Sequence, residues 1–467
     1  MSYLDEYRSK LVSPEEAVKI VKSGDWIDWG AALAQPYALD NALANRKDEL
    51  KDIKIRCTLS LKEHEIWKQD PNGETFTFNN WHFGGLDRKY HDKGLANYIP
   101  MLFRNEPLYY RKSLYDDVDV VMIRVTPMNK HGYFNFHCAV TASAAQCDMA
   151  KKVIVEVNPK LPWAMGGSEE CIHISKVDFI VQAESPVATL PPAAPTDVDK
   201  RIANLVVDEI VDGSCIQLGI GGMPNTVGTL LAESDLKDLG CQTEMMVDAY
   251  YHLYKAGKLT NKFKGIDKGK STFSFAAGSP FLYEWIDNNP SLASYSSDYI
   301  NNPYNMAMND NMVSINNCLE VDLFGQVSSE SSGSRQISGT GGQLDFVTGA
   351  YMSKGGKSIL CCQSSYIDKQ GVLQSRIIPT LPVGSIVTVP RTQTHIIITE
   401  YGKADLAGRS TWERTERLIN IAHPDKREEL IKEAEKMKIW RRTNKLTQAT
   451  SSLKVARSLG DYNAVAR

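Results

Sequence analysis

Near the start of the chain, hydrophobic and polar positions follow a helix–strand–helix order. Ser13-Pro14-Glu15-Glu16 is a capping-box start with proline at the first helical position, so the pattern predicts a helix over residues 14–22. After a break at Ser23-Gly24-Asp25, the segment Trp26-Ile27-Asp28-Trp29 is typical of a short strand, which we expect Gly30 to end. Pro36 then opens a second helix that extends to about residue 46.

The same order of elements recurs about 185 residues further along the chain. Residues 197–210 have a helical pattern, Asp212-Gly213-Ser214 breaks it, and Cys215-Ile216-Gln217-Leu218 is predicted to be a strand. A glycine turn then leads to Pro224 and to a helix that we expect to end near Leu231.

A pair of similar turns also suggests a repeat. Lys130-His131-Gly132 follows an apolar strand at 118–125, and Lys369-Gln370-Gly371 follows one at 358–362. These turns are about 240 residues apart, so their pairing predicts an insertion of about 55 residues in the second half.

Between the two halves, residues 185–195 contain four prolines and read as a linker. We therefore predict an α/β protein made of two similar tandem α/β domains, the first over residues 1–185 and the second over residues 196–445. A strand at 395–400 and helices from 411 to about 438 complete the second domain. The last 25 or so residues are polar and small, a composition typical of a poorly ordered tail.

Composition and charge narrow the class of protein. The chain has 467 residues, 42% of them hydrophobic and 23% charged, which is ordinary for a globular enzyme of two domains. A formal net charge of -3 gives no reason to expect nucleic acid or a membrane surface as partner. No signal-peptide pattern and no long apolar run is present, so we expect a cytoplasmic protein.

The cysteines and histidines give no indication of metal or disulfide chemistry. There is no Cys-x-x-Cys pair, and several cysteines lie inside apolar runs, as buried reduced thiols do. The histidines have no metal-ligand spacing, so no metal site is predicted. The nine cysteines are Cys57, Cys138, Cys147, Cys171, Cys215, Cys241, Cys318, Cys361 and Cys362.

One carboxylate in an apolar segment is the main candidate for chemistry. Glu244 lies within Cys241-Gln242-Thr243-Glu244-Met245-Met246-Val247, between a predicted helix and a predicted strand. Two glycine loops accompany it, Gly219-Ile220-Gly221-Gly222-Met223-Pro224-Asn225 upstream and Gly339-Thr340-Gly341-Gly342-Gln343-Leu344-Asp345 downstream. A partly desolvated carboxylate beside backbone N–H donors can attack a thioester, with the N–H groups binding the oxyanion. The alternative is a structural carboxylate at a strand end.

Nucleotide-binding motifs are incomplete. The Gly219 loop lacks the third glycine of the dinucleotide fingerprint and an acidic partner about 20 residues later. Gly-Lys-Ser occurs at Gly269 and at Gly356, but neither has the leading glycine of a P-loop. A dinucleotide-dependent oxidoreductase is therefore the weakest alternative.

With these motifs in view, the chain resembles a family I coenzyme A transferase of the butyryl-CoA:acetate and 4-hydroxybutyrate CoA-transferase branch. The resemblance covers nearly the whole chain. Besides the two glycine loops, it is carried by Thr126-Pro127-Met128-Asn129-Lys130-His131-Gly132, Glu156-Val157-Asn158-Pro159, Glu320-Val321-Asp322-Leu323-Phe324-Gly325-Gln326-Val327 and Thr399-Glu400-Tyr401-Gly402-Lys403-Ala404-Asp405-Leu406.

The resemblance implies an active site in the cleft between the two domains, with Glu244 as the catalytic residue. It places oxyanion amides at or near Ile220 and at Gly341 or Gly342. The oxyanion and CoA-binding residues that it implies are Gly219, Ile220, Gly221, Gly222, Met223, Pro224, Asn225, Glu320, Gly341 and Gly342. The 4-hydroxybutyrate type commonly reads Glu-Met-x-Ser-Asp-Gly, whereas this chain has Val247-Asp248-Ala249. That departure favours a more apolar acyl pocket.

The expected reaction is transfer of CoA from a short-chain acyl-CoA, butyryl-CoA above all, to a carboxylate such as acetate, in ping-pong fashion through a glutamyl-CoA thioester. CoA is then a substrate, no cofactor is held permanently, and family resemblance suggests a homo-oligomer. An acyl-CoA hydrolase and a non-catalytic acyl-CoA-binding protein remain as alternatives. Secondary assignments are Gln217, Asn225 or Gln343 as orienters of the incoming carboxylate, His252 as a structural residue, and Tyr250 and Tyr251 as core or pocket.

Overall fold

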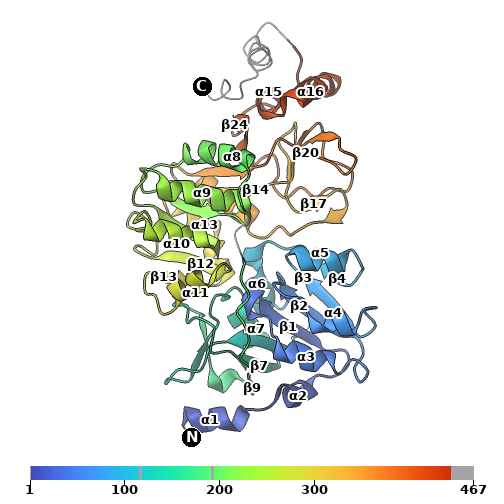
Figure 1. Ribbon diagram of the computed structural model, residues 1–467, viewed down its shortest axis with the longest axis vertical. Helices are drawn as coiled ribbons and strands as arrows, with labels where there is room; N and C mark the ends of the chain where they lie inside the picture. The colour runs from blue at the N-terminus through green and yellow to red at the C-terminus, as the bar shows by residue number, and fades with distance from the viewer. Residues whose placement is uncertain (1, 115–117, 191–193, 443–467) are drawn as a thin grey trace.

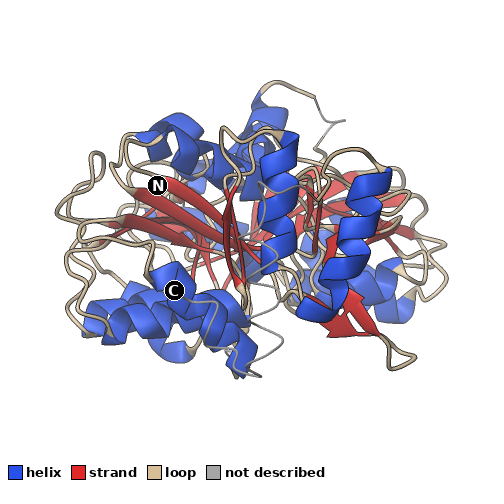
Figure 2. Cartoon of the chain, turned by 90° about the horizontal axis from the view of Figure 1, so that it is seen from above, coloured by secondary structure: helices blue, strands red, loops and turns tan. Residues whose placement is uncertain are grey.

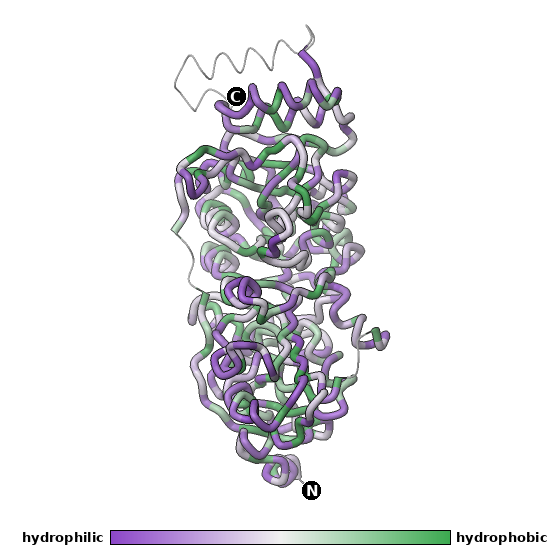
Figure 3. Tube along the Cα trace, turned by 90° about the vertical axis from the view of Figure 1, so that its right-hand side faces the viewer, coloured by the Kyte–Doolittle hydropathy of each residue, from purple (hydrophilic) through white to green (hydrophobic). Residues whose placement is uncertain are grey.

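A computed structural model describes residues 2–114, 118–190 and 194–442 of the chain. The polar tail predicted for the last residues lies outside the described residues. The molecule is elongated, with the N-terminal helix at one end and the last described helices at the other (Figure 1). Hydrophobic segments are distributed through both halves (Figure 3). In the part of the chain that is described, no helix is long and apolar enough to cross a membrane.

The N-terminal half is built on a seven-stranded sheet in the order β4-β3-β2-β1-β5-β7-β9. Every neighbouring pair in this sheet is parallel. Both faces of such a sheet must be covered, and apolar clusters accordingly lie on either side of it. The strands are β1 (Trp26–Ala31), β2 (Ile53–Thr58), β3 (Phe76–Asn80), β4 (Ala96–Tyr98), β5 (Val120–Val125), β7 (Lys152–Val157) and β9 (Phe179–Gln182).

The C-terminal half is built on an eight-stranded sheet in the order β13-β12-β11-β10-β14-β19-β23-β24. Its pairs are parallel except for the final hairpin between β23 and β24. The strands are β10 (Cys215–Leu218), β11 (Gly240–Met246), β12 (Ser271–Ala276), β13 (Leu292–Ser294), β14 (Met312–Asn317), β19 (Lys357–Cys361), β23 (Ile396–Thr399) and β24 (Gly402–Asp405).

Small strands lie outside the two main sheets. They are β6 (Tyr133–Asn135) and β8 (Cys171–His173) in the first half, and β15 (Glu320–Asp322), β16 (Val327–Ser328), β17 (Ser331–Ser332), β18 (Arg335–Gln336), β20 (Ser365–Ile367), β21 (Leu373–Ser375) and β22 (Ile377–Ile378) in the second.

Helices lie on both faces of the sheets (Figure 2). In the first half they are α1 (Tyr3–Lys10), α2 (Pro14–Ala17), α3 (Ala38–Ala44), α4 (Glu65–Gln69), α5 (Gly85–His91), α6 (Glu106–Arg111) and α7 (Ser143–Met149). In the second half they are α8 (Asp197–Val207), α9 (Gly222–Glu233), α10 (Asp248–Lys255), α11 (Pro280–Ile286), α12 (Ser297–Ile300), α13 (Pro303–Ala307), α14 (Gln343–Met352), α15 (Thr411–Ile421) and α16 (Pro424–Lys436).

The two sheets share one strand order. Each sheet begins at one edge with four strands in reverse chain order, β4-β3-β2-β1 and β13-β12-β11-β10. Three later strands follow in the first sheet and four in the second, where β24 is the additional one. Strand β1 therefore corresponds to β10, β2 to β11 and β5 to β14. This topology supports the predicted tandem repeat. The predicted pairing of the two Lys-x-Gly turns is wrong, because one follows β5 whereas the other follows β19, the counterpart of β7. The second half is longer because its β14–β19 and β19–β23 connections, where the small strands lie, are longer than their counterparts, and because β24, α15 and α16 follow β23.

Several predicted boundaries also differ from the structure. The first predicted helix is short, with α2 followed by a 3₁₀ turn at Val18–Ile20. Gly30 lies inside β1 rather than ending it; a Cβ there would come within 2.5 Å of the Ala34 Cβ, so a glycine is needed where the next turn folds back. Helix α9 begins at Gly222, before Pro224, and Glu244 lies on strand β11 itself rather than between a helix and a strand.

Candidate active site

A cavity of about 550 Å³ lies between the two halves of the molecule. It is lined from the first half by Leu59, Ser60, Leu61, His82, Phe83, Gly84, Gly85, Leu86 and Arg88, and from the second by Gln217, Leu218, Gly219, Ile220, Glu244, Met245, Asn316, Asn317, Ser329, Ser338, Gly339, Thr340, Gly341, Gly342, Gln343 and Phe346, with Leu190 from the linker. The segments after β2 and β3 thus face β11 and the loops after β10 and before α14.

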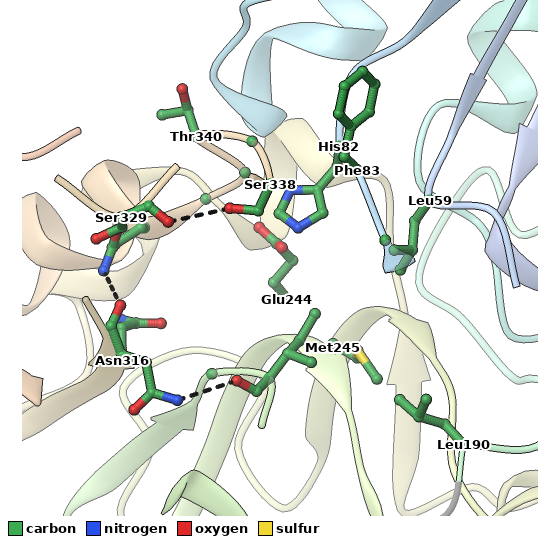
Figure 4. A pocket seen from close by; sticks show the side chains of 18 of the residues that line it. Leu59, His82, Phe83, Leu190, Glu244, Met245, Asn316, Ser329, Ser338 and Thr340 are labelled. Atoms are coloured by element: carbon green, nitrogen blue, oxygen red, sulfur yellow. Dashed lines mark hydrogen bonds between the residues drawn. The ribbon is translucent and has the colours of Figure 1, made fainter. Parts of the chain in front are cut away.

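The cavity has an apolar side and a polar side. Leu59, Met245 and Leu190 lie together on one side of Glu244, and Asn316, Ser329 and Ser338 lie on the other (Figure 4). Leu59 also packs against the apolar core of the second half. The cavity can therefore hold an alkyl chain and a polar chain at the same time, one on each side of a carboxyl group.

Glu244 points from β11 into this cavity (Figure 4). The Asn301 side-chain amide, just after α12, donates a hydrogen bond of 2.6 Å to Glu244 Oε2. The backbone N–H of Gly342 donates a second hydrogen bond to the same carboxyl group. Gly342 is the residue that precedes α14, so the positive end of that helix faces the carboxylate. Two donors and a helix terminus thus fix the orientation of the Glu244 side chain.

The loop before α14 can approach Glu244 only because Gly341 and Gly342 lack side chains. A Cβ on Gly342 would lie 2.0 Å from Asn301 Nδ2 and 2.1 Å from Glu244 Oε2. Gly341 has φ +52°, the left-handed region that favours glycine, and its Cβ would lie 3.6 Å from Glu244 Oε1. The two adjacent glycines bring backbone against the carboxylate, as expected from the sequence motif.

Burial dominates the electrostatics of the site. It raises the pKa of Glu244 to about 7, because desolvation of the charged form outweighs the hydrogen bonds from Asn301 and Gly342 that lower the pKa. Two more carboxyl groups interact with this charge, Glu106 of α6 and Asp345 of α14. Burial raises the pKa of each of these to about 8, although Arg104 contacts Asp345 at 3.1 Å and lowers the pKa of its carboxyl group.

His82 lies just after β3, on the wall of the cavity beside Glu244 (Figure 4). Burial, with a smaller contribution from Arg88, lowers the pKa of His82 to about 4. The ring is therefore neutral at physiological pH and adds no positive charge to the site.

The loop after β10 forms another wall. Gly219 and Ile220 line the cavity, and a Cβ on Gly219 would lie 2.8 Å from Asn316 Oδ1. The side chains of Gln217 and Asn316 hydrogen-bond to each other at 3.0 and 3.1 Å. Gly221 has φ +129°, a conformation that a glycine adopts readily, and α9 begins directly after it.

The other residues implied by the family resemblance lie outside this cavity. Gly222 and Met223 line a second cavity of about 380 Å³, which shares Asn317 with the first. Pro224 lies inside α9, and Asn225 lines a third cavity, near the end of the linker. Glu320 lies outside all three cavities, beside Arg376, which lines the second cavity. Burial raises the pKa of Glu320, and the charge of Arg376 partly offsets that rise.

Of the residues to which the sequence analysis gave secondary roles, some line the main cavity and others do not. Gln343 and Gln217 line the main cavity, and Asn225 does not. Tyr250 is fully buried in the core, where its hydroxyl accepts a hydrogen bond from the Leu218 N–H at 2.9 Å. His252 is exposed on α10, away from the cavity lining.

Sequence reasoning missed Asn301, His82 and the apolar wall at Leu59. Asn301 is 57 residues from Glu244 in the chain, and its sequence surroundings carry no local motif. His82 and Leu59 come from the opposite half. The signal that could have found them is their position directly after β2 and β3, two strands that the sequence analysis did not predict, since residues beyond the carboxyl ends of parallel strands commonly line ligand sites.

Among the described residues, no group of three or more His, Cys, Asp or Glu side chains is arranged to hold a metal ion. The nine cysteines are all free, and eight of them are buried.

Comparison with known proteins agrees with this geometry. Residues 1–191 match the acetyl-CoA hydrolase/transferase N-terminal domain, and residues 278–434 match the acetyl-CoA hydrolase/transferase C-terminal domain. The chain belongs to the acetyl-CoA hydrolase/transferase family.

Within that family, the chain is similar to particular CoA-transferases. It is 53% identical to the "Probable butyrate:acetyl-CoA coenzyme A-transferase" of Syntrophomonas wolfei over 95% of this chain and 99% of that protein. It is 52% identical to the "Butyryl-CoA:acetate CoA-transferase" of Anaerostipes caccae over 95% of this chain and 100% of that protein. The structure of RipA from Yersinia pestis matches with a TM-score of 0.86 and 36% identity, over 94% of this chain and 100% of that one. These findings confirm the family and the fold class that the sequence predicted.

Proposed function

We propose that this protein transfers coenzyme A from a short-chain acyl-CoA, butyryl-CoA above all, to a carboxylate such as acetate, with Glu244 as the nucleophile. The observation that carries the proposal is the placement of Glu244, a buried carboxyl group held by Asn301 and Gly342 between an apolar and a polar side of one cavity. The names of the two relatives that are more than half identical to this chain support the choice of butyryl-CoA and acetate.

In the first half-reaction, the Glu244 carboxylate attacks the acyl carbonyl carbon of the acyl-CoA. The C–S bond breaks, and the departing thiolate leaves a mixed anhydride between Glu244 and the acyl group. The thiolate then attacks the glutamyl carbonyl carbon and releases the acyl group as a free carboxylate. What remains on the protein is a glutamyl-CoA thioester.

The second half-reaction is the reverse sequence with acetate. Acetate attacks the glutamyl carbonyl and displaces the CoA thiolate, and the thiolate then attacks the acetyl carbonyl of the new anhydride. Acetyl-CoA leaves and the Glu244 carboxylate is restored. One thioester is exchanged for another, so the cycle balances without ATP and without net proton transfer.

The surroundings of Glu244 suit these steps. A carboxylate with a pKa of about 7 is a stronger nucleophile than an exposed one, and a substantial fraction is ionised at neutral pH. Each tetrahedral intermediate needs N–H donors, worth about 3 kcal/mol apiece in acyl transfer. We assign this role to Gly341 or Gly342 on one side and to the backbone at Gly219 and Ile220 on the other, because all four residues line the cavity.

We also retain Gly221, Gly222, Met223, Pro224, Asn225 and Glu320 as proposed contributors to CoA binding. Gly222 and Met223 line the second cavity, which adjoins the first at Asn317. CoA is a long molecule, so two adjoining cavities provide room for its thiol end and for part of its polar chain. Arg376 in the second cavity, beside Glu320, is a cation suited to phosphate.

We infer that CoA enters only as a substrate, that the protein holds no permanent cofactor, and that it works in the cytoplasm as a homo-oligomer. Its nine free cysteines are in keeping with a reducing compartment. We also retain residues 1–185 and 196–445 as the proposed domain limits; β9 ends at Gln182 and α8 begins at Asp197.

The proposal is tested by incubating the protein with butyryl-CoA, with and without acetate, and measuring its mass. We expect a CoA adduct on the peptide containing Glu244, formed without acetate and discharged when acetate is added. Glu244→Gln serves as the control and should stay unmodified. Release of free CoA without an acceptor would instead identify a hydrolase, and binding without any turnover would identify a non-catalytic acyl-CoA-binding protein.

A further inference from the structure

The glycine loop before α14 belongs to the second half of the chain, but residues of the first half hold its backbone. The Tyr98 hydroxyl, at the end of the edge strand β4, accepts a hydrogen bond of 3.1 Å from the Thr340 N–H. The Phe103 N–H donates a hydrogen bond of 3.0 Å to the Gly341 carbonyl oxygen. Thr340 and Gly341 directly precede Gly342, whose N–H contacts Glu244, so the first half is tied to the loop on both sides of one peptide unit.

Behind this loop lies a buried carboxyl group that the proposed reaction does not use. Glu330, between β16 and β17, is 2% exposed. Its oxygens accept hydrogen bonds from the Tyr98 hydroxyl at 3.1 Å, from the Thr340 hydroxyl at 3.0 and 3.1 Å, and from the Thr388 hydroxyl at 3.0 Å. Three hydroxyl donors from three separate segments converge on one carboxyl group.

Tyr98 is the residue that joins these contacts. Its hydroxyl donates to Glu330 and accepts from the Thr340 backbone, so a single oxygen links the carboxyl group, the loop and the edge of the first sheet. Burial, together with the nearby charge of Glu330, raises the pKa of Tyr98 to about 12, so the hydroxyl keeps the proton that it donates.

We propose that Tyr98 and Glu330 are positioning residues, which transmit the placement of the first half to the Thr340–Gly342 backbone and so hold the Gly342 N–H on Glu244. This inference rests on the proposed function. Its physical basis is that reaction at Glu244 requires the donor and the nucleophile to keep their geometry, since a misplacement of about 1 Å can cost about 100-fold in rate. Neither residue lines the cavity, so each acts through the loop rather than on the substrate.

The test compares Tyr98→Phe with the wild type and with Tyr7→Phe in steady-state CoA transfer from butyryl-CoA to acetate. Tyr7 on α1 is a matched control: its hydroxyl accepts a hydrogen bond of 2.9 Å from Gln182, far from the cavity. For Tyr98→Phe we expect kcat to fall about 10- to 100-fold. We expect KM for butyryl-CoA to stay within about threefold of the wild-type value, because groups that bind the substrate are unchanged. Tyr7→Phe should leave both constants unchanged.

A second readout separates positioning from general loosening of the fold. The Gly342 hydrogen bond lowers the pKa of Glu244, so its weakening should move the acid limb of the kcat/KM profile to higher pH in Tyr98→Phe. Glu106 and Asp345, the carboxyl groups that interact with Glu244, and His82 beside it are unaltered in this variant. Tyr7→Phe should keep the wild-type profile even if its melting temperature falls.

Glu330→Gln provides the same test from the other side of the contact. Its amide oxygen can still accept from one or two of the three hydroxyls, so we expect a smaller loss of kcat than in Tyr98→Phe, with the acid limb moved in the same direction. If Tyr98→Phe does not fold, this variant carries the test.

Unchanged kcat in both variants, or a lower kcat with an unmoved acid limb, would overturn the inference while the proposed function stands. A wild-type protein that forms no CoA adduct and transfers no CoA would instead overturn the proposed function, and the inference with it.

Discussion

Replacement of Gly342 by alanine tests the proposed chemistry at its most crowded point. The backbone of Gly342 has φ -98° and ψ 10°, which alanine can adopt, so the methyl group itself is the perturbation. That methyl carbon would lie 2.0 Å from Asn301 Nδ2 and 2.1 Å from Glu244 Oε2. A carbon and an oxygen that are not bonded need more than 3 Å, so the carboxyl group and the amide must move by about 1 Å.

A shift of about 1 Å at a nucleophile costs about 100-fold in rate, or nearly 3 kcal/mol of transition-state stabilisation. We therefore expect kcat for CoA transfer in Gly342→Ala to fall at least 100-fold. Folding should survive, because Glu244 lines the open cavity and can move toward it, and the melting temperature should change by only a few degrees.

The assay is steady-state transfer from butyryl-CoA to acetate, followed by the mass of the protein after incubation with butyryl-CoA alone. Gly85→Ala is the matched control: Gly85 also lines the cavity, but its Cβ would meet only the end of the Arg88 side chain, at 3.8 Å. Transfer by Gly342→Ala within a few-fold of the wild-type rate would refute the close approach of loop and nucleophile on which the proposed function depends.

Three further outcomes follow from the charges in the site. Glu244→Gln should lower transfer by several orders of magnitude, while CoA binding in calorimetry persists, and near-normal transfer in this variant would place the nucleophile elsewhere. Glu244→Asp, which is shorter by one methylene, should lower transfer about 100-fold and raise the ratio of hydrolysis to transfer. The kcat/KM of the wild type should rise with pH through about 7, because only the ionised Glu244 attacks, and a flat profile from pH 5 to 9 would contradict the raised pKa. Burial raises the pKa of Glu106 from 4.5 to about 8, so the folded protein holds this proton more tightly than the unfolded chain does. The stability that this gives is complete below pH 4.5 and is lost as pH rises through 8, at about 1.4 kcal/mol per pH unit. Urea unfolding at pH 6 and pH 8 should therefore show a smaller loss of stability in Glu106→Gln than in the wild type, and equal losses would show that Glu106 ionises normally.

Elements bounded by strong local signals could be predicted from the sequence. The strand Cys215–Leu218 has the predicted bounds, because a turn precedes it and a glycine follows it. Gly30 misled the prediction because the reason for a glycine there is tertiary: the chain folds back and brings Ala34 and Ile123 against it. A glycine that ends a strand and a glycine that accommodates a neighbour look the same in the sequence.

Some residues of the candidate site are likewise marked by a local sequence motif, and others are not. Glu244 and the glycines at 219, 341 and 342 stand in local motifs, and the structure brings all four to one cavity. Asn301 reaches Glu244, and His82 reaches the cavity, only through the packing of separate segments, and no periodicity or spacing marks them. The raised pKa of Glu106 is likewise a property of its burial by distant residues, which a sequence does not display.

The shared strand order of the two sheets has a consequence for how this protein can change. Strand β11 carries Glu244, and its counterpart β2 leads into Leu59, on the opposite wall of the same cavity. One copy of the repeated unit thus carries the proposed nucleophile, and the other supplies a wall of the cavity to which the proposed reaction assigns no bond-making step. Mutation at positions 59–61 and 82–86 can alter which acids fit without altering the nucleophile, so the duplicated architecture leaves substrate range free to diverge while the reaction stays the same.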